Sequence, residues 1–105
     1  MNDPLLVLTT HPEIEGAERL AAKLVREGLA ACVNVLPAMH SFYVWEGRET
    51  SGTEHLLVIK TQDARYPQVE AAILDAHPYE LPEIIATPIS RGLPGYLNWI
   101  ESRTS

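Results

Sequence analysis

The residue types best suited to chemistry gather between His77 and Glu83, where an imidazole, a phenol and two carboxylates lie between and beside two prolines. Each proline fixes its own φ at about −65° and disfavours helical geometry in the residue before it, so this segment is expected to be rigid and extended. Imidazole and carboxylate groups are ligands for divalent metals. We therefore expect His77 to be the main donor of a metal site, with Glu80 and Glu83 as helpers.

His77 and the single cysteine, Cys32, also have simpler interpretations. A histidine after the end of a helix is favoured by the helix dipole and can hydrogen-bond to the backbone. Cys32 lies in an apolar run, where a free cysteine usually packs as a small hydrophobic residue, although its thiolate is also a metal ligand or redox group. His11, His40 and His55 have neither a helical i, i+4 partner nor a nearby cysteine, so we expect satisfied or solvated surface histidines.

A second group of candidate residues predicts a ligand cleft: Lys60, Glu54, Tyr79, Trp45 and Glu83. Lys60 ends an otherwise apolar strand face and needs a partner or a ligand there. One alternative is a buried ion pair of Lys60 with Glu83 at a subunit junction. The other is an anionic small molecule bound in a cleft between subunits, walled by Trp45 and Tyr79. Trp45 is equally suited to packing in an interface.

Composition and motifs exclude several classes of protein. A chain of 105 residues forms one domain, 1–105, and its net charge of −6 disfavours binding to nucleic acid. A single cysteine fits a reducing compartment, and the apolar run Leu5–Leu8 is too short for a signal peptide or a membrane span. The sequence has no Ser-His-Asp pattern, phosphate-binding glycine loop or metalloprotease spacing. It predicts a cytoplasmic protein that is not an enzyme.

Hydrophobic periodicity predicts the elements that position these residues. Apolar residues at helical spacing predict a helix that Gly28 closes and a second helix that Asp63 and Pro67 open. A short terminal helix is expected over Tyr96–Ile100, and a polar hairpin turn over Glu46–Gly52. The predicted strands are Leu5–Thr10, Leu29–Leu36 with its continuation Met39–Trp45 beyond a bulge at Pro37, Leu56–Thr61 and Ile84–Ser90.

This βαββαβ order predicts a ferredoxin-like α+β fold. Right-handed crossovers place both long helices on one face of a four-stranded antiparallel sheet, with the short helix following. The strands are apolar on both sides, as Leu56 and Val58 against Leu57 and Ile59 illustrate. A sheet face that is apolar and uncovered is unusual in a monomer, so we expect a homo-oligomer.

Four segments carry a specific likeness along nearly the whole chain: Glu27–Val35, Tyr43–Gly47, Ile59–Thr61 and His77–Ile84. In this order and spacing they resemble the CutA family of divalent-cation tolerance proteins. The resemblance implies a homotrimer of ferredoxin-like subunits joined by strand pairing between subunits, similar in assembly to the PII signalling proteins. It also implies a role in tolerance of copper and other divalent metals.

One departure from the family pattern concerns the metal. The resemblance associates copper with a cysteine at the end of the first strand and two adjacent histidines before the Pro-Tyr pair. The corresponding positions here are Thr9 and Ala76-His77, so His77 alone remains of that set. Two functions are therefore expected: a trimeric cytoplasmic protein that binds divalent metal, copper in particular, or a PII-like sensor that binds an anionic small molecule between subunits.

Overall fold

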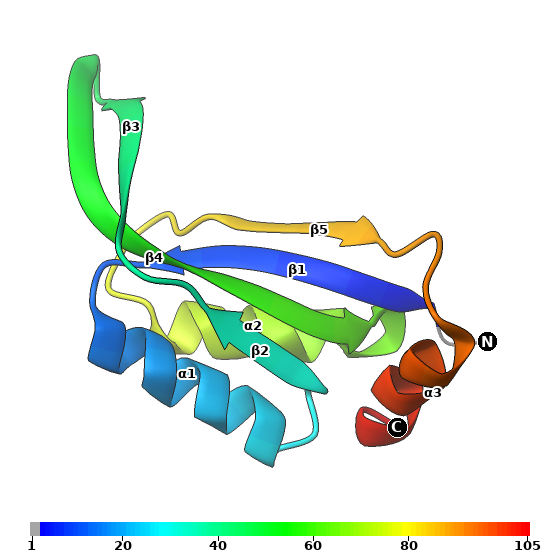
Figure 1. Cartoon of the computed structure of the whole chain (residues 1–105). Helices are drawn as coiled ribbons and strands as arrows, with labels where there is room; N and C mark the ends of the chain where they lie inside the picture. The colour runs from blue at the N-terminus through cyan, green and yellow to red at the C-terminus, as the bar shows by residue number, and fades with distance from the viewer. Residues whose placement is uncertain (1–2) are drawn as a thin grey trace.

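The computed structural model describes residues 3–105, so the first two residues of the predicted domain lie outside the described part. Within that part, an α+β architecture is built from five strands, three α-helices and one short 3₁₀ helix (Figure 1). The elements are β1 (Pro4–His11), α1 (Ile14–Arg26), β2 (Cys32–Val35), β3 (Met39–Trp45), β4 (Arg48–Gln62), η1 (Asp63–Arg65), α2 (Tyr66–Ala76), β5 (Ile84–Pro88) and α3 (Pro94–Arg103).

The strands form one antiparallel sheet in the order β2-β4-β1-β5, and β3 pairs with the first half of β4. β1 is central, and its Val7 lies between Ile59 of β4 and Ala86 of β5. Both α1 and α2 cover the same face of this sheet (Figure 1). The predicted ferredoxin-like arrangement is confirmed.

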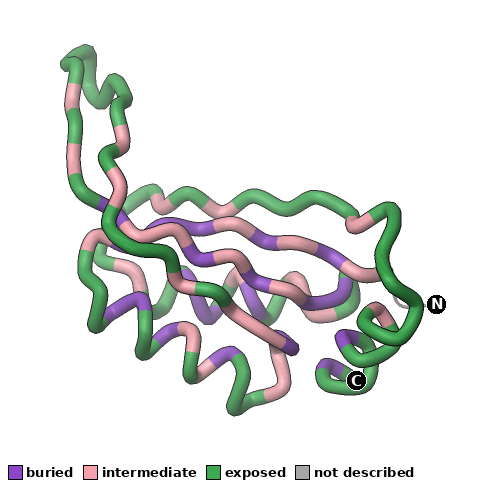
Figure 2. The backbone as a smooth tube through the Cα atoms, in the orientation of Figure 1, coloured by how far each residue is buried: buried purple, intermediate pink, exposed green. Residues whose placement is uncertain are grey.

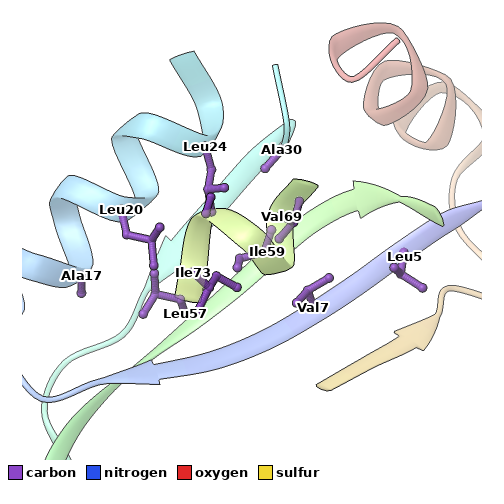
Figure 3. Packing of buried hydrophobic residues seen from close by; sticks show 11 residues of the cluster. Leu5, Val7, Ala17, Leu20, Leu24, Ala30, Leu57, Ile59, Val69 and Ile73 are labelled. Atoms are coloured by element: carbon purple, nitrogen blue, oxygen red, sulfur yellow. The ribbon is translucent and has the colours of Figure 1, made fainter. Parts of the chain in front are cut away.

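The hydrophobic core lies between the two helices and the covered face of the sheet (Figure 3). Alternation along β4 turns every second side chain toward the helices, which is why its apolar residues reach the core. The buried side chains come from α1 (Leu20, Leu24), β1 (Val7), β4 (Leu57, Ile59) and α2 (Val69, Ile73). α3 extends beyond the predicted Tyr96–Ile100 and buries Ile100.

The predicted long second strand is two strands, because residues 36–38 belong to neither strand, although the N–H of Leu36 still donates to the carbonyl oxygen of Leu56. Proline has no N–H to donate, so the pairing with β4 is interrupted there. The register shifts across the gap: Val35 pairs with Leu57, whereas Met39 pairs with Glu54, so residues 36–38 lie opposite residues 55 and 56. One extra residue is therefore accommodated, which confirms the predicted bulge and corrects the number of strands from four to five.

The predicted turn over Glu46–Gly52 is wrong in length, since β4 already begins at Arg48. The turn consists of Glu46 and Gly47, whose φ angles are 51° and 78°. Two consecutive positive φ values allow a two-residue hairpin, whose twist matches that of the paired strands. The polar residues after Gly47 thus belong to a strand, and their polarity reflects solvent exposure rather than a loop.

We call the hairpin formed by β3 and residues 48–53 of β4 the arm. It projects from the body of the subunit at the end opposite to α3 (Figure 1), and most of it is exposed (Figure 2). Its apolar side chains face solvent: Phe42 is 79% exposed and Val44 is 64% exposed. The sheet face that lacks helices is also incompletely covered, with Ile85 55% exposed. No helix within residues 3–105 has the length and apolar character needed to cross a membrane.

Candidate functional site

A pocket of about 520 Å³ lies where the arm joins the body of the subunit. Three parts of the chain enclose it: the end of β1, the paired strands β3 and β4, and the proline-bounded segment after α2. The lining residues are Thr10, Ser41, Phe42, Tyr43, Trp45, Glu54, Pro78, Tyr79, Glu80, Leu81 and Glu83. Four of the five residues predicted for a ligand cleft, namely Glu54, Tyr79, Trp45 and Glu83, are therefore brought together.

The strand register explains one wall of this pocket. Met39 pairs with Glu54, and directly paired residues of an antiparallel ladder point to the same side. With a side-chain period of two, Ser41, Tyr43 and Trp45 share that side with Glu54. The opposite wall is the segment 78–83, in which Pro78 and Pro82 restrict the backbone. The site is thus positioned by a strand ladder and by two prolines.

Glu54 is the most buried acidic residue of the pocket, with 7% of its surface exposed. Thr10 Oγ1 donates a hydrogen bond of 3.2 Å to Glu54 Oε2. Partial burial, together with the hydrogen bond to Glu54 and the negative charge of that carboxylate, raises the pKa of the Tyr79 phenol to about 12. Tyr79 is therefore a neutral donor at physiological pH. Within residues 3–105, the Glu54 carboxylate thus accepts from the uncharged hydroxyl group of Thr10 and lies near the neutral phenol of Tyr79.

His77 ends α2 and uses both of its ring nitrogens on the backbone. The N–H of Tyr79 donates to His77 Nδ1 over 3.1 Å, so Nδ1 carries a lone pair. Nε2 must then carry the proton, and it donates to the carbonyl oxygen of Thr10 over 2.5 Å. The interpretation of His77 as a residue hydrogen-bonded to the backbone at a helix end is confirmed. Metal ligation through Nδ1 would require the Tyr79 hydrogen bond to open.

His11 is buried, with 2% of its surface exposed, so its expected surface location is wrong. Its Nδ1 accepts a hydrogen bond of 3.0 Å from the N–H of Glu13, and its ring centroid lies 5.1 Å from that of His77. Burial lowers the pKa of His11, and the nearby His77 lowers it further. Gly16 makes this burial possible, because a Cβ at that position would lie 2.2 Å from His11 Cε1. His40 is exposed, and His55 Nδ1 lies 3.2 Å from the carbonyl oxygen of Leu36.

Lys60 and Cys32 lie together elsewhere on the sheet, as direct partners in the β2–β4 ladder. Lys60 Nζ contacts Asn34 Oδ1 and lies 3.9 Å from Cys32 Sγ. Lys60 lies six positions after Glu54 on β4, which is about 20 Å along a strand. Within one subunit the structure thus pairs Lys60 with Asn34 rather than with the expected Glu83, and it does not bring Lys60 into the pocket.

The predicted metal donors do not converge within a single subunit. Across residues 3–105, no group of three His, Cys, Asp or Glu side chains is placed to hold a metal ion. Glu80 and Glu83 line the pocket, His77 is engaged with the backbone, and Cys32 lies beside Lys60. The donor set of one chain therefore does not fit a metal site with three or four convergent ligands.

Sequence reasoning missed several lining residues, among them Thr10, Ser41, Phe42 and Tyr43. A signal for two of them was present, since the predicted strand Met39–Trp45 already places residues 41, 43 and 45 on one face. Thr10 had no such signal. It lies near the arm only because β1 pairs with both β4 and β5, with Thr10 opposite Leu56.

Comparison with known proteins gives consistent matches over nearly the whole chain. The "Divalent-cation tolerance protein CutA" of Thermus thermophilus is 41% identical over 99 residues, which cover 94% of this chain and 96% of that protein. The "Protein CutA, chloroplastic" of Arabidopsis thaliana is 40% identical over 100 residues, 95% of this chain but 55% of that protein. The crystal structure of CutA from Xylella fastidiosa matches with a TM-score of 0.95 at 40% identity, covering 98% of this chain and 99% of that chain.

The family model described as "CutA1 divalent ion tolerance protein" matches residues 5–103. That range includes every residue that lines the pocket, from Thr10 to Glu83. The chain belongs to the CutA1 divalent ion tolerance protein family.

Proposed function

We propose that this protein serves divalent-cation tolerance in the cytoplasm as a homotrimer and without enzymatic activity. The observation that carries the assembly is the arm, an extended hairpin whose apolar side chains Phe42 and Val44 face solvent. Exposed apolar surface of this kind favours association, and a strand edge offers unpaired backbone groups to a neighbour. The number of subunits, three, is taken from the family resemblance.

Light scattering tests the assembly directly. A trimer has about three times the subunit mass of 11.7 kDa at micromolar concentration. Phe42→Asp together with Val44→Asp should shift the mass toward the single subunit, because two charges would be buried without partners. Leu74→Asp is the control, since Leu74 is half-exposed on the outer side of α2. A parent protein that runs as a single subunit of about 12 kDa contradicts the proposal.

The metal part of the proposal is weak binding of a divalent cation, copper in particular, with His77 as the main donor and Glu80 or Glu83 as helpers. The support is their position: Glu80 and Glu83 line one pocket, and His77 directly precedes that segment. Because one subunit does not supply three convergent donors, the remaining ligands would come from solvent or a neighbouring subunit.

Calorimetric titration with copper(II) tests this assignment. His77→Ala should weaken copper binding, whereas His40→Ala, at an exposed position on β3, should leave it unchanged. Cys32→Ser should also have no effect, since Cys32 lies beside Lys60 rather than beside His77. Equal affinity of the parent and His77→Ala would remove His77 from the site.

A PII-like sensor role is the second candidate, and the pocket of about 520 Å³ favours it because ligand sites commonly have this size. In the expected form of this role, an anionic ligand binds near Lys60. Such an anion should raise the thermal stability of the protein, and Lys60→Ala should abolish this effect. Lys60 contacts Asn34 and does not line the pocket of its own subunit. Absence of stabilisation across a panel of anionic metabolites would contradict this form of the hypothesis.

A further inference from the structure

The charge of the pocket has one sign. Three of its eleven lining residues are glutamates, namely Glu54, Glu80 and Glu83, and none is lysine, arginine or histidine. A concave site lined by acidic groups concentrates cations and repels anions. The expected anionic ligand therefore does not suit this pocket, whatever binds elsewhere on the assembled protein.

Glu54 identifies the point at which a positive charge is missing. The residue is 7% exposed, its carboxylate accepts a hydrogen bond from the hydroxyl group of Thr10, and the phenol of Tyr79 lies nearby. Burying a carboxylate is costly unless it is both hydrogen-bonded and compensated by a charge. Thr10 supplies a hydrogen bond, while residues 3–105 place no cationic side chain in the pocket lining.

The dimensions and the other walls decide which cation fits. A volume of about 520 Å³ far exceeds the space of a bare metal ion, and the glutamates are not grouped as metal ligands. The remaining wall is largely aromatic, with Tyr43, Trp45 and Tyr79 among the lining residues. Aromatic rings attract ammonium and guanidinium groups through their faces, most strongly in tryptophan.

We propose that this pocket binds a small organic cation, whose ammonium or guanidinium group pairs with Glu54 while its apolar part contacts Trp45 and Tyr79. Glu80 and Glu83 lie in the same lining and attract the cation to the pocket. The proposal adds a ligand class to this protein and does not depend on metal binding. The cation is a free small molecule, not a side chain of a neighbouring subunit.

The experiment is calorimetric titration of the assembled protein, in the presence of EDTA, with butylguanidinium and with butylurea. The two probes have nearly the same shape, and only the first is charged. Butylguanidinium should bind at least about tenfold more tightly than butylurea, because only the cation forms a pair with the buried carboxylate. Equal binding of both probes, or binding of neither, overturns the proposal. A pocket already filled by a neighbour's basic side chain gives the latter result.

Variants locate the interaction. Glu54→Gln keeps an acceptor for Thr10 and removes the charge, so it should weaken butylguanidinium binding about tenfold or more. Glu49→Gln is the matched control, because Glu49 is an exposed arm residue outside the pocket lining and should bind as the parent does. If Glu54→Gln does not fold, Trp45→Leu supplies the test. Loss of the ring should weaken the binding of butylguanidinium more than the binding of butylurea. If the folded variant prefers butylguanidinium over butylurea as strongly as the parent does, the assignment of the cation to this pocket is refuted.

Discussion

His77→Ala separates a structural role of His77 from a role as metal ligand. The ring joins the end of α2 to β1 through Thr10 and fixes the start of the pocket segment through Tyr79. Each neutral hydrogen bond contributes about 1 kcal/mol, and the ring also packs against His11 and Tyr79 at 5.1 and 4.7 Å between centroids. The N–H of Tyr79 is exposed and can be rehydrated, which partly offsets the loss of its hydrogen bond, while the lost ring packing adds to the cost. The free energy of unfolding should fall by about 2 kcal/mol.

The assay is guanidinium chloride unfolding followed by circular dichroism. All variants are compared at one subunit concentration, because the stability of an oligomer depends on concentration. His40→Ala is the control and should change the free energy by less than about 0.5 kcal/mol, as an exposed substitution. In thermal unfolding, 2 kcal/mol corresponds to a fall of about 10 °C for a domain of this size.

One result would refute this reasoning: unfolding of His77→Ala at the same denaturant concentration as the parent. The hydrogen bonds of His77 would then contribute nothing, and a loss of copper binding in that variant would report direct ligation. Nitrogen NMR gives an independent check, since the two backbone partners require the proton on Nε2 and the lone pair on Nδ1.

Three further predictions concern the surroundings of the pocket. Burial and the nearby His77 lower the pKa of His11 below 6.5, so the unfolded chain binds more protons at this residue than the folded chain. The free energy of unfolding should therefore be retained above pH 6.5 and fall as the pH drops below it. In urea unfolding, the difference in stability between pH 7.5 and pH 5.5 should be smaller for His11→Asn than for the parent. Gly16→Ala places a methyl group 2.2 Å from His11 Cε1 and should cost about 1–3 kcal/mol in the same assay, whereas Gly95→Ala, with no atom within 4 Å, should not destabilise the protein. Tyr79→Phe should remove the component near pH 12 from the tyrosine absorbance titration, and an unchanged titration would contradict the contact with Glu54.

The helices and most strand positions were predictable because each rests on local periodicity. The positions of Leu20 and Leu24 at helical spacing, and of Leu57 and Ile59 at strand spacing, mark the side chains that the core buries. Pro37 was recognised as a bulge because a missing N–H has the same consequence in any sheet. The turn at Glu46 and Gly47 was misjudged, since polar residues on an exposed strand resemble a loop in the sequence.

The sequence by itself determined the order of the elements, the family and the rigidity of the segment after α2, because these depend on local chemistry and on recognisable motifs. Only the tertiary structure decided which candidate residues meet. Glu54 and Lys60 share one strand and the same predicted face, yet the arm and the proline-bounded segment enclose Glu54, whereas Lys60 lies where β4 pairs with β2. The tertiary structure likewise set both ring nitrogens of His77 against the backbone, so that ligation through Nδ1 requires the hydrogen bond from Tyr79 to open. Contacts between residues distant in the chain depend on strand register and crossovers, which no local pattern specifies.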